Sequence, residues 1–303
     1  MEQPSEHGDA GDFPEIEFKD VSLKFDEKTA LSDVSFKLNP REMLLVTGVA
    51  ASGKSVLLHL AMGLLKPTSG QIFVRGREID LLDESKLLGM RGDIMGLVFQ
   101  EEALFTGMTV YDNAAYRLTE HNWSEEKIER AVHDILTFVG LEDDSTKFPE
   151  ELSVGMKRRL EVARALAGWP PIMLLDEPTG GLDPLTNKQM LDLVIRARDI
   201  HKISAVYVTK ELHELPYLVH HRAISDSSGQ VTITPTDPEN RPASRVMVLD
   251  AGHVAFTGSL EEFDSSTNPA VLNVKGLTVD MPKNLPLPAD PWKKKPGSGS
   301  AVW

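Results

Sequence analysis

Hydrophobic residues alternate with polar ones early in this chain and recur with a helical period further along it. From Ile16 to Leu38 apolar residues occupy every second or third position, which predicts short antiparallel strands. The uninterrupted apolar runs at 43–46, 172–175 and 204–208 are typical of strands buried in a parallel sheet. Further strands are predicted at 71–75, at 97–100, and in a hairpin over 245–256 that turns at 250–252.

Helical periodicity dominates the middle of the sequence. It runs from 111 to 167, with breaks near 122–124 and 142–149. Shorter helices are predicted at 56–65, at 185–201 and from 211. Strands that alternate with helices in this way indicate an α/β fold with a parallel core sheet. The N-terminal alternation adds an antiparallel β lobe, and the central helices add a helical subdomain at about 100–169.

Three segments lack any periodicity. Residues 1–14 are polar and acidic and predict a disordered leader, and residues 276–303, rich in Pro, Lys, Gly and Ser, predict a disordered tail. The segment 226–244, rich in Ser, Thr, Pro and Asp, predicts an exposed insertion. This insertion is either a regulatory or partner contact or simply a solvated loop. The folded domain is therefore expected to span residues 15–275.

Composition narrows the functional classes. The 303 residues carry a formal net charge of -14, which argues against nucleic-acid binding and against direct adsorption to anionic lipid. No apolar run reaches the length of about 20 residues that a membrane-spanning helix needs. The absence of cysteine fits a reducing cytoplasm. Any membrane association is therefore expected to go through a protein partner.

The first candidate site lies between the apolar run 43–46 and the helix that follows it. Here the sequence fits G-x-x-x-x-G-K-[ST], the loop that cradles phosphates in P-loop NTPases. Its glycines permit a tight turn whose N–H groups point at phosphate oxygens, while the lysine reaches the β- and γ-phosphates and the serine holds Mg²⁺. The expected ATP-binding residues are Gly48, Val49, Ala50, Ala51, Ser52, Gly53, Lys54, Ser55 and Val56.

The second candidate site is the pair of carboxylates that ends the run 172–175. Ligands of α/β sheets bind at the carboxyl ends of the strands, where Asp176 and Glu177 lie in sequence. Asp176 is expected to hold Mg²⁺ together with Ser55, and Glu177 to polarise the attacking water. The alternative, an acidic turn at a strand end, is common on its own and becomes improbable beside a P-loop.

A third motif, Leu152-Ser153-Val154-Gly155-Met156, opens a basic helix and completes a set of ordered motifs. With it, the chain resembles the ATP-binding subunits of ABC transporters, whose signature is L-S-G-G-Q. This resemblance covers about residues 15–275 and implies a RecA-like P-loop core. It further implies that two copies sandwich two ATP molecules, each closed over by Ser153, Gly155 and Met156 of the other copy.

The resemblance assigns three more residues. Phe25 falls where the family stacks an aromatic ring on adenine, although a strand residue buried in the core is an equal alternative. Gln100 matches the Q-loop glutamine, which senses Mg²⁺ and contacts the membrane partner. Asp183, in the motif L-D-E-P-T-G-G-L-D, matches the D-loop aspartate that reaches across the dimer.

Two positions depart from the family pattern. Val154 replaces the first signature glycine with a stiff β-branched side chain. Lys210 stands where the family has a switch histidine that grips the γ-phosphate and orients Glu177 and water. A lysine supplies charge but not the two-nitrogen geometry of imidazole. We therefore predict intact ATP binding with slowed hydrolysis. His213 is either a substitute for the missing histidine or an ordinary surface residue.

The stretch from Gln100 to Asn113 gives the finest prediction. It is similar to the F-Q-x-x-A-L-F-x-x-M-x-V-x-x-N segment of ATPases that serve Mla/MCE-type phospholipid transporters, as is Gly155-Met156-x-Arg158-Arg159. This similarity implies a cytoplasmic homodimer bound to a permease, and through it to an MCE-type protein. The expected permease contacts are Gln100, Leu104, Phe105 and Met108, of which the last three are alternatively subdomain core.

Three rival functions remain open from the sequence. They are the ATPase of another ABC importer or exporter, a hydrolysis-impaired nucleotide-gated scaffold, and a soluble ABC protein of DNA repair or translation. The second is prompted by Lys210 and Val154. The third usually carries coiled-coil insertions or two cassettes in one chain, and neither is visible here.

Overall fold

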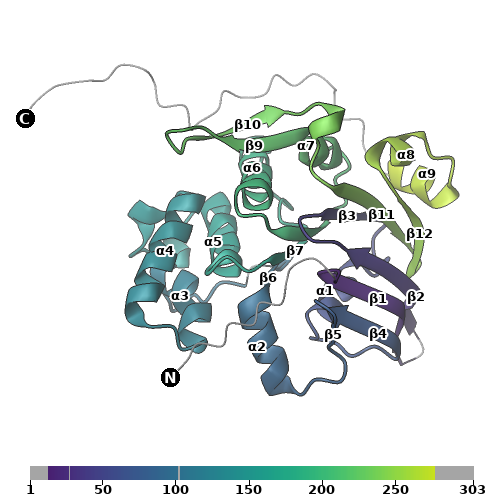
Figure 1. Ribbon diagram of the computed structural model, residues 1–303, viewed down its shortest axis with the longest axis horizontal. Coiled ribbons are helices and arrows are strands. Elements are labelled where there is room, and N and C mark those ends of the chain that lie inside the picture. The colour runs from purple at the N-terminus through teal and green to yellow at the C-terminus, as the bar shows by residue number, and fades with distance from the viewer. Residues whose placement is uncertain (1–12, 27, 102, 277–303) are drawn as a thin grey trace, which may run out of the picture.

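The fold consists of a parallel core sheet, an antiparallel lobe and a helical subdomain (Figure 1). The structure is a computed structural model, and it describes residues 13–26, 28–101 and 103–276. The main sheet has six strands in the order β12-β11-β3-β8-β7-β6, all parallel except the edge strand β12. Their bounds are β3 Met43–Thr47, β6 Met95–Val98, β7 Ile172–Asp176, β8 Ser204–Val208, β11 Ser244–Asp250 and β12 His253–Gly258.

Strand β3 lies inside this sheet and is buried on both faces. Met43 and Leu45 pack into one hydrophobic cluster with the helical subdomain, whereas Leu44 and Val46 pack into a second cluster with the antiparallel lobe. Successive residues of a strand point to opposite faces, so a strand covered on both faces needs an uninterrupted apolar run. This confirms the predicted α/β P-loop fold with a buried parallel sheet.

The antiparallel lobe is built from fewer and longer strands than the sequence predicts. Its order is β2-β1-β4-β5, with bounds β1 Ile16–Phe25, β2 Lys28–Leu38, β4 Ser69–Val74 and β5 Arg77–Glu78. The β1–β2 register shifts between Phe18 and Val21, and Asp20 there has φ of 50°. A β-bulge inserts one residue without ending the strand. The three-residue spacing of apolar positions thus marks a bulge, and the prediction of several short strands was wrong.

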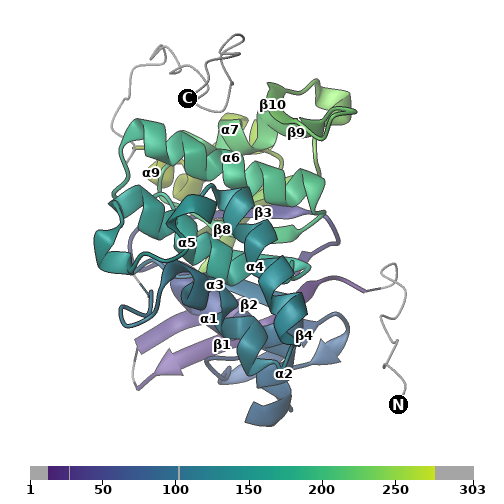
Figure 2. The same cartoon turned by 90° about the vertical axis from the view of Figure 1, so that its left-hand side faces the viewer.

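The helices are distributed around the two main sheets (Figures 1 and 2). Helices α3, α4 and α5 pack on one another and form the helical subdomain, while α1 follows the P-loop beneath the antiparallel lobe. Their bounds are α1 Lys54–Ala61, α2 Glu84–Ile94, α3 Val110–Glu120, α4 Glu125–Val139, α5 Val154–Leu166, α6 Pro184–Ile200, α7 Glu214–His220, α8 Leu260–Ser265 and α9 Pro269–Gly276. Single 3-10 turns lie at Glu142–Asp144, Pro149–Glu151 and Pro238–Asn240.

Helix α2 is the one long helix that the sequence analysis misses. It buries only Leu87 and Met90 and contains two glycines, so its apolar periodicity is weak. A local signal does exist, because the Asp83 side chain accepts a hydrogen bond from the Lys86 N–H as an N-cap. None of the helices in the described part of the chain combines the length and apolarity that crossing a bilayer requires.

The segment 226–244 contains regular structure. Strand β10 (Val231–Pro235) pairs antiparallel with β9 (His221–Ser225), and this hairpin packs on α6. Two residues of α6 anchor β9: Arg198 donates to the carbonyl oxygen of His221, and Asp199 accepts from the N–H of Ala223. The interpretation as a wholly solvated loop is therefore wrong for β10. The predicted leader and tail lie almost entirely outside the described residues.

A stacked histidine joins α6 to the helical subdomain and gives a pH prediction. The rings of His201 and Trp169 are parallel with centroids 3.3 Å apart. Burial and the nearby Arg196 lower the pKa of His201 to about 4 from 6.5. Between pH 6.5 and pH 4 the imidazole of His201 is protonated in the unfolded chain but stays neutral in the folded chain. The free energy of unfolding therefore decreases as the pH falls through this range. His201 is partly exposed, so we expect a loss on the order of 1 kcal/mol between pH 7 and pH 5.

Urea unfolding at pH 7 and pH 5 measures this loss. In His201→Gln the loss between the two pH values should shrink, whereas His253→Gln, at an exposed position of β12, should leave it unchanged. An identical loss in wild type and His201→Gln would show that other groups control the pH dependence.

Candidate nucleotide-binding and hydrolysis site

The loop between β3 and α1 depends on its two glycines. A Cβ at Gly48 would lie 2.2 Å from the carbonyl oxygen of Leu249, so no side chain fits there. Gly53, the N-cap of α1, has φ of 104°, and a Cβ on it would lie 2.6 Å from Leu31 Cδ2. Only glycine combines that backbone conformation with so close an approach. Close contacts with β2 at Gly53 and with β11 at Gly48 thus fix the conformation of the loop.

Lys54 is held inside this loop. Its Nζ donates to the carbonyl oxygens of Gly48 and Val49, both at 2.9 Å. Burial lowers the pKa of Lys54, and the charges of Glu177 and Asp176 oppose that shift. Among the described residues no side chain caps the N-terminus of α1, so its first N–H groups remain available to an anion. The loop therefore fits a phosphate chain, as the motif predicts.

Asp176 provides a site suited to Mg²⁺. It ends β7, is 5% exposed, and its Oδ1 has no hydrogen-bond partner among the described residues. Burial raises the pKa of Asp176, while the Ser55 hydroxyl acts in the opposite direction. A buried carboxylate oxygen without a partner is costly unless a cation or water satisfies it. Asp176 and Ser55 supply the oxygen ligands that Mg²⁺ prefers.

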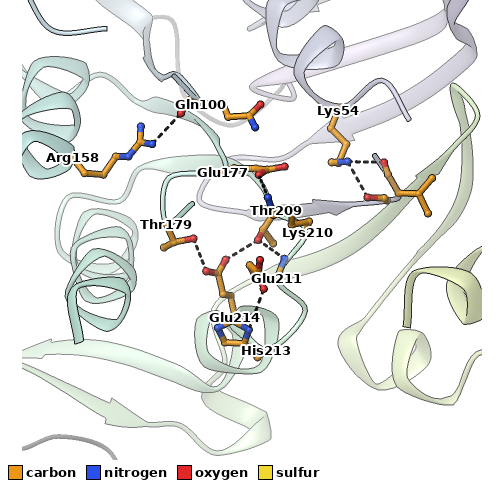
Figure 3. A network of polar contacts seen from close by, with 12 residues as sticks. Lys54, Gln100, Arg158, Glu177, Thr179, Thr209, Lys210, Glu211, His213 and Glu214 are labelled. Carbon is orange, nitrogen blue, oxygen red and sulfur yellow. Dashed lines mark hydrogen bonds and ion pairs between the residues drawn. The ribbon is translucent and has the colours of Figure 1, made fainter. Parts of the chain in front are cut away.

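Glu177 follows Asp176 in a strained turn. Its φ of 45° is unusual for a non-glycine residue, and its N–H donates to the carbonyl oxygen of Val208 at 3.0 Å. Lys210 Nζ lies 3.1 Å from Glu177 Oε2 (Figure 3). The hydrogen bond and the charge of Glu177 raise the pKa of Lys210. The residue that replaces the family's histidine is therefore a cation paired with the predicted catalytic base.

His213 does not take the place of the missing histidine. Its ring is half exposed, and its Nδ1 lies 3.8 Å from Glu211 Oε2. Figure 3 shows His213 on the far side of Glu214 from Glu177. The surface interpretation of His213 is thus the correct one for this structure.

The ion pair leads to a prediction about turnover. Lys210→His should raise ATP turnover about tenfold, which corresponds to about 1.4 kcal/mol in the barrier. A lysine only donates and holds the Glu177 oxygen, whereas a neutral imidazole can donate through one nitrogen and accept through the other. Phosphate release at saturating MgATP measures the change. Lys202→His, at an exposed lysine, is the matched control and should behave as wild type. Unchanged or lower turnover in Lys210→His would contradict the prediction.

The signature motif lies against the D-loop. Ser153 caps α5 by accepting a hydrogen bond from the Met156 N–H at 3.3 Å. A Cβ on Gly155 would lie 2.5 Å from Thr186 Cγ2 at the start of α6, and Asp183 caps that helix. Val154 is 68% exposed. The structure thus brings Ser153, Gly155 and Asp183 together on one surface.

Charged side chains of α5 hold the backbone of the Q-loop in place (Figure 3). Arg158 belongs to the signature stretch named in the sequence, whereas Glu161 and Arg164 do not. Arg158 donates to the carbonyl oxygen of Gln100 at 3.0 Å. Glu161 pairs with Arg158 at 2.6 Å and accepts from the N–H of Ala103 at 3.1 Å. Arg164 donates to the Ala103 carbonyl oxygen. Gln100 and Ala103 are therefore tied to the signature helix, and no local pattern in the sequence reveals these contacts.

The predicted aromatic and permease contacts divide between surface and core. Phe25 is 46% exposed at the end of β1, so its interpretation as a core residue was wrong. Leu104 is buried and belongs to the subdomain core, which confirms for this residue the alternative to a permease contact. Phe105 is 37% exposed and its ring packs on Tyr116 with centroids 4.6 Å apart. Met108 is partly buried next to it. Of the predicted permease contacts, Gln100 and Phe105 are thus exposed and Leu104 is buried.

Comparison with known proteins identifies the family. The model described as ABC transporter matches residues 31–180. The chain is 34% identical over 278 residues to the methionine import ATP-binding protein MetN of Leifsonia xyli subsp. xyli (strain CTCB07), spanning 91% of this chain and 74% of that protein. It is also 34% identical over 276 residues to the protein TRIGALACTOSYLDIACYLGLYCEROL 3, chloroplastic, of Arabidopsis thaliana, spanning 88% and 75%.

A solved structure agrees with this. The ATP-binding cassette MJ0796, in a dimeric post-hydrolysis state bound to ADP and Pi, matches with a TM-score of 0.67 and 26% identity over 81% of this chain and 98% of that one. The chain therefore belongs to the ATP-binding subunits of ABC transporters. Members of this family bind ATP with Mg²⁺, dimerise, pair with membrane permeases and couple ATP hydrolysis to transport, and this chain is such an ATPase.

Proposed function

We propose that this chain powers lipid transport through an MCE-type permease, as a homodimer on the cytoplasmic side of the membrane. The observation that carries the proposal is the segment 100–113, whose sequence resembles the ATPases of such systems. Asn113, fully buried, donates to the carbonyl oxygens of Phe105 and Met108 and accepts from the Phe105 N–H. This fixes the turn that presents the exposed Phe105 ring. A relative with a glycolipid in its name, trigalactosyldiacylglycerol, supports the lipid class.

We assign the chemistry to the residues of the site as follows. Lys54 and the N–H groups at the start of α1 bind the phosphates of ATP. Asp176 and Ser55 would hold Mg²⁺, and Gln100 of the Q-loop would sense it. Mg²⁺ supplies charge neutralisation at the phosphates. Glu177 polarises the attacking water as general base, and Lys210 orients Glu177.

The surface that carries Ser153 and Gly155 completes the site of a second copy. Within one chain, α5 belongs to the helical subdomain and α1 lies beneath the antiparallel lobe, so the two motifs belong to separate parts of the fold (Figure 1). Asp183, next to the signature, is placed to cross the dimer interface. The dimeric state of the similar cassette supports this arrangement.

Methionine import is the second candidate function. Several relatives of this chain at 33–37% identity are methionine import ATP-binding proteins. These matches span 67–91% of this chain, whereas the lipid interpretation rests on the local segment 100–113 and on one relative with a glycolipid in its name. The two functions differ in the permease and in the ligand that the complex carries.

Purification of the native membrane complex distinguishes them. If the proposal holds, an affinity-tagged chain will bring down an MCE-type permease, and mass spectrometry will find phospholipid in the complex. Methionine binding by the complex, with no lipid enrichment, would favour the second candidate. Phe105→Ala should weaken the capture of the permease. Leu88→Ala is the control, because Leu88 is an exposed leucine on α2, outside the predicted contact.

A further inference from the structure

A fully buried glutamate lies beneath the predicted hydrolysis site. Glu214 is the first residue of α7, has 0% exposure and belongs to none of the motifs of the sequence analysis. Four side chains donate hydrogen bonds to it, and Figure 3 shows those of Thr179 and Thr209. Oε1 accepts from Thr179 at 2.5 Å and Asn187 at 2.9 Å, and Oε2 accepts from Thr209 at 2.8 Å and Tyr207 at 2.9 Å. A buried carboxylate is stable only when its oxygens are satisfied in this way.

The four donors are of two kinds. Tyr207 lies in β8 and Asn187 in α6, so these two come from regular elements of the core. Thr179 and Thr209 lie in the two loops that carry the predicted chemistry. Thr179 comes two residues after Glu177, and Thr209 immediately precedes Lys210. Glu214 therefore connects two separate loops to one rigid point.

These contacts close a ring with the ion pair. Thr209 also accepts from the N–H of Glu211 at 2.9 Å and donates its own N–H to the carbonyl oxygen of Val46 at 3.0 Å. From Glu214 the ring runs through Thr209 to Lys210, across the 3.1 Å ion pair to Glu177, and back through Thr179. Lys210 is a long and 59% exposed side chain, so its position depends on where its backbone is fixed.

We propose that Glu214 is a positioning residue for ATP hydrolysis, and that it sets the relative position of Glu177 and Lys210. It holds both loops through charge-assisted hydrogen bonds, which are about twice as strong as neutral ones. This inference rests on the roles proposed above for Glu177 and Lys210. Glu214 itself acts from below the site, through the two threonines.

Four single substitutions test the proposal, because each removes one hydrogen bond from the same carboxylate. The loop variants are Thr179→Val and Thr209→Val, and the matched core variants are Tyr207→Phe and Asn187→Ala. We expect the loop variants to lower kcat about tenfold or more, with KM for ATP changed by less than about twofold. The core variants should lower the unfolding midpoint but keep kcat within about twofold of wild type.

Two further measurements separate positioning from a loss of structure. Thr179→Ser and Thr209→Ser keep the hydroxyl and should retain wild-type kcat, even if a valine variant folds poorly. In a Lys210→Ala background, Thr209→Val should have little additional effect on kcat, because the residue through which it acts is gone. Equal kcat losses in all four variants, or none in the loop variants, would overturn the proposal. Full activity in Glu177→Gln would contradict the proposed role of Glu177. This outcome differs from the outcomes that contradict the role of Glu214, so the two failures can be distinguished.

Discussion

Replacing Glu177 with Gln should lower ATP turnover at least about 100-fold, which is the contribution typical of a general base. The amide has nearly the shape of the carboxylate but cannot take a proton from the attacking water. Glu177 is 13% exposed in its side chain, and the carboxylate next to it in the sequence, Asp176, is assigned to Mg²⁺ and not to the attacking water. Binding of MgATP should persist, because Lys54 and the P-loop are untouched.

Phosphate release at saturating MgATP, together with titration of a fluorescent ATP analogue, measures both parts of this prediction. Glu211→Gln is the matched control, because Glu211 is an acidic residue of the next loop whose side chain faces His213. It should retain wild-type turnover. If the wild-type protein released no measurable phosphate, the rival function, a hydrolysis-impaired nucleotide-gated scaffold, would be supported instead. Residual turnover near the wild-type level in Glu177→Gln would assign the base to another residue.

Lys54→Met should weaken ATP binding about 100-fold or more. Each charge-assisted hydrogen bond contributes about 1.5–3 kcal/mol, and the predicted role of Lys54 includes one to each of two phosphates. The substitution also removes the donor from the carbonyl oxygens of Gly48 and Val49. We therefore expect the loop to lose its shape as well as its charge.

Isothermal titration of MgATP measures the affinity, and hydrogen exchange over residues 48–53 measures the order of the loop. Lys86→Met removes a lysine that is 65% exposed and pairs with Asp83 on α2, so it should change neither. Affinity in Lys54→Met within about threefold of wild type would contradict the assignment of the P-loop lysine.

The core of the nucleotide site could be predicted from the sequence because its parts are local. The loop 48–55 and the pair Asp176-Glu177 each follow directly after a buried strand, and β3 and β7 both flank β8 in the parallel sheet. Parallel strands bring their carboxyl ends to one edge, so motifs distant in sequence meet without further specification. Gly48 and Gly53 are needed at positions where a turn and a close approach leave no room for a side chain.

Other features were decided by tertiary contacts. Glu214 meets Thr179 across 35 positions of sequence, and Arg158 meets Gln100 across 58. Neither pair has a fixed spacing or a periodic pattern that a sequence reading could detect. The exposure of Phe25, the strand β10 and the weakly amphipathic helix α2 likewise depend on what packs beside them.

The pairing of Lys210 with Glu177 shows the division most clearly. The sequence by itself determined that a lysine replaces the family's switch histidine and that an intact Glu177 follows the apolar run 172–175 and Asp176. Only the tertiary structure decided that the two side chains meet at 3.1 Å and that Glu214 holds both of their loops. The reason is physical: a covalent chain fixes the order of residues, whereas the distance between two loops is set by the buried side chains packed between them.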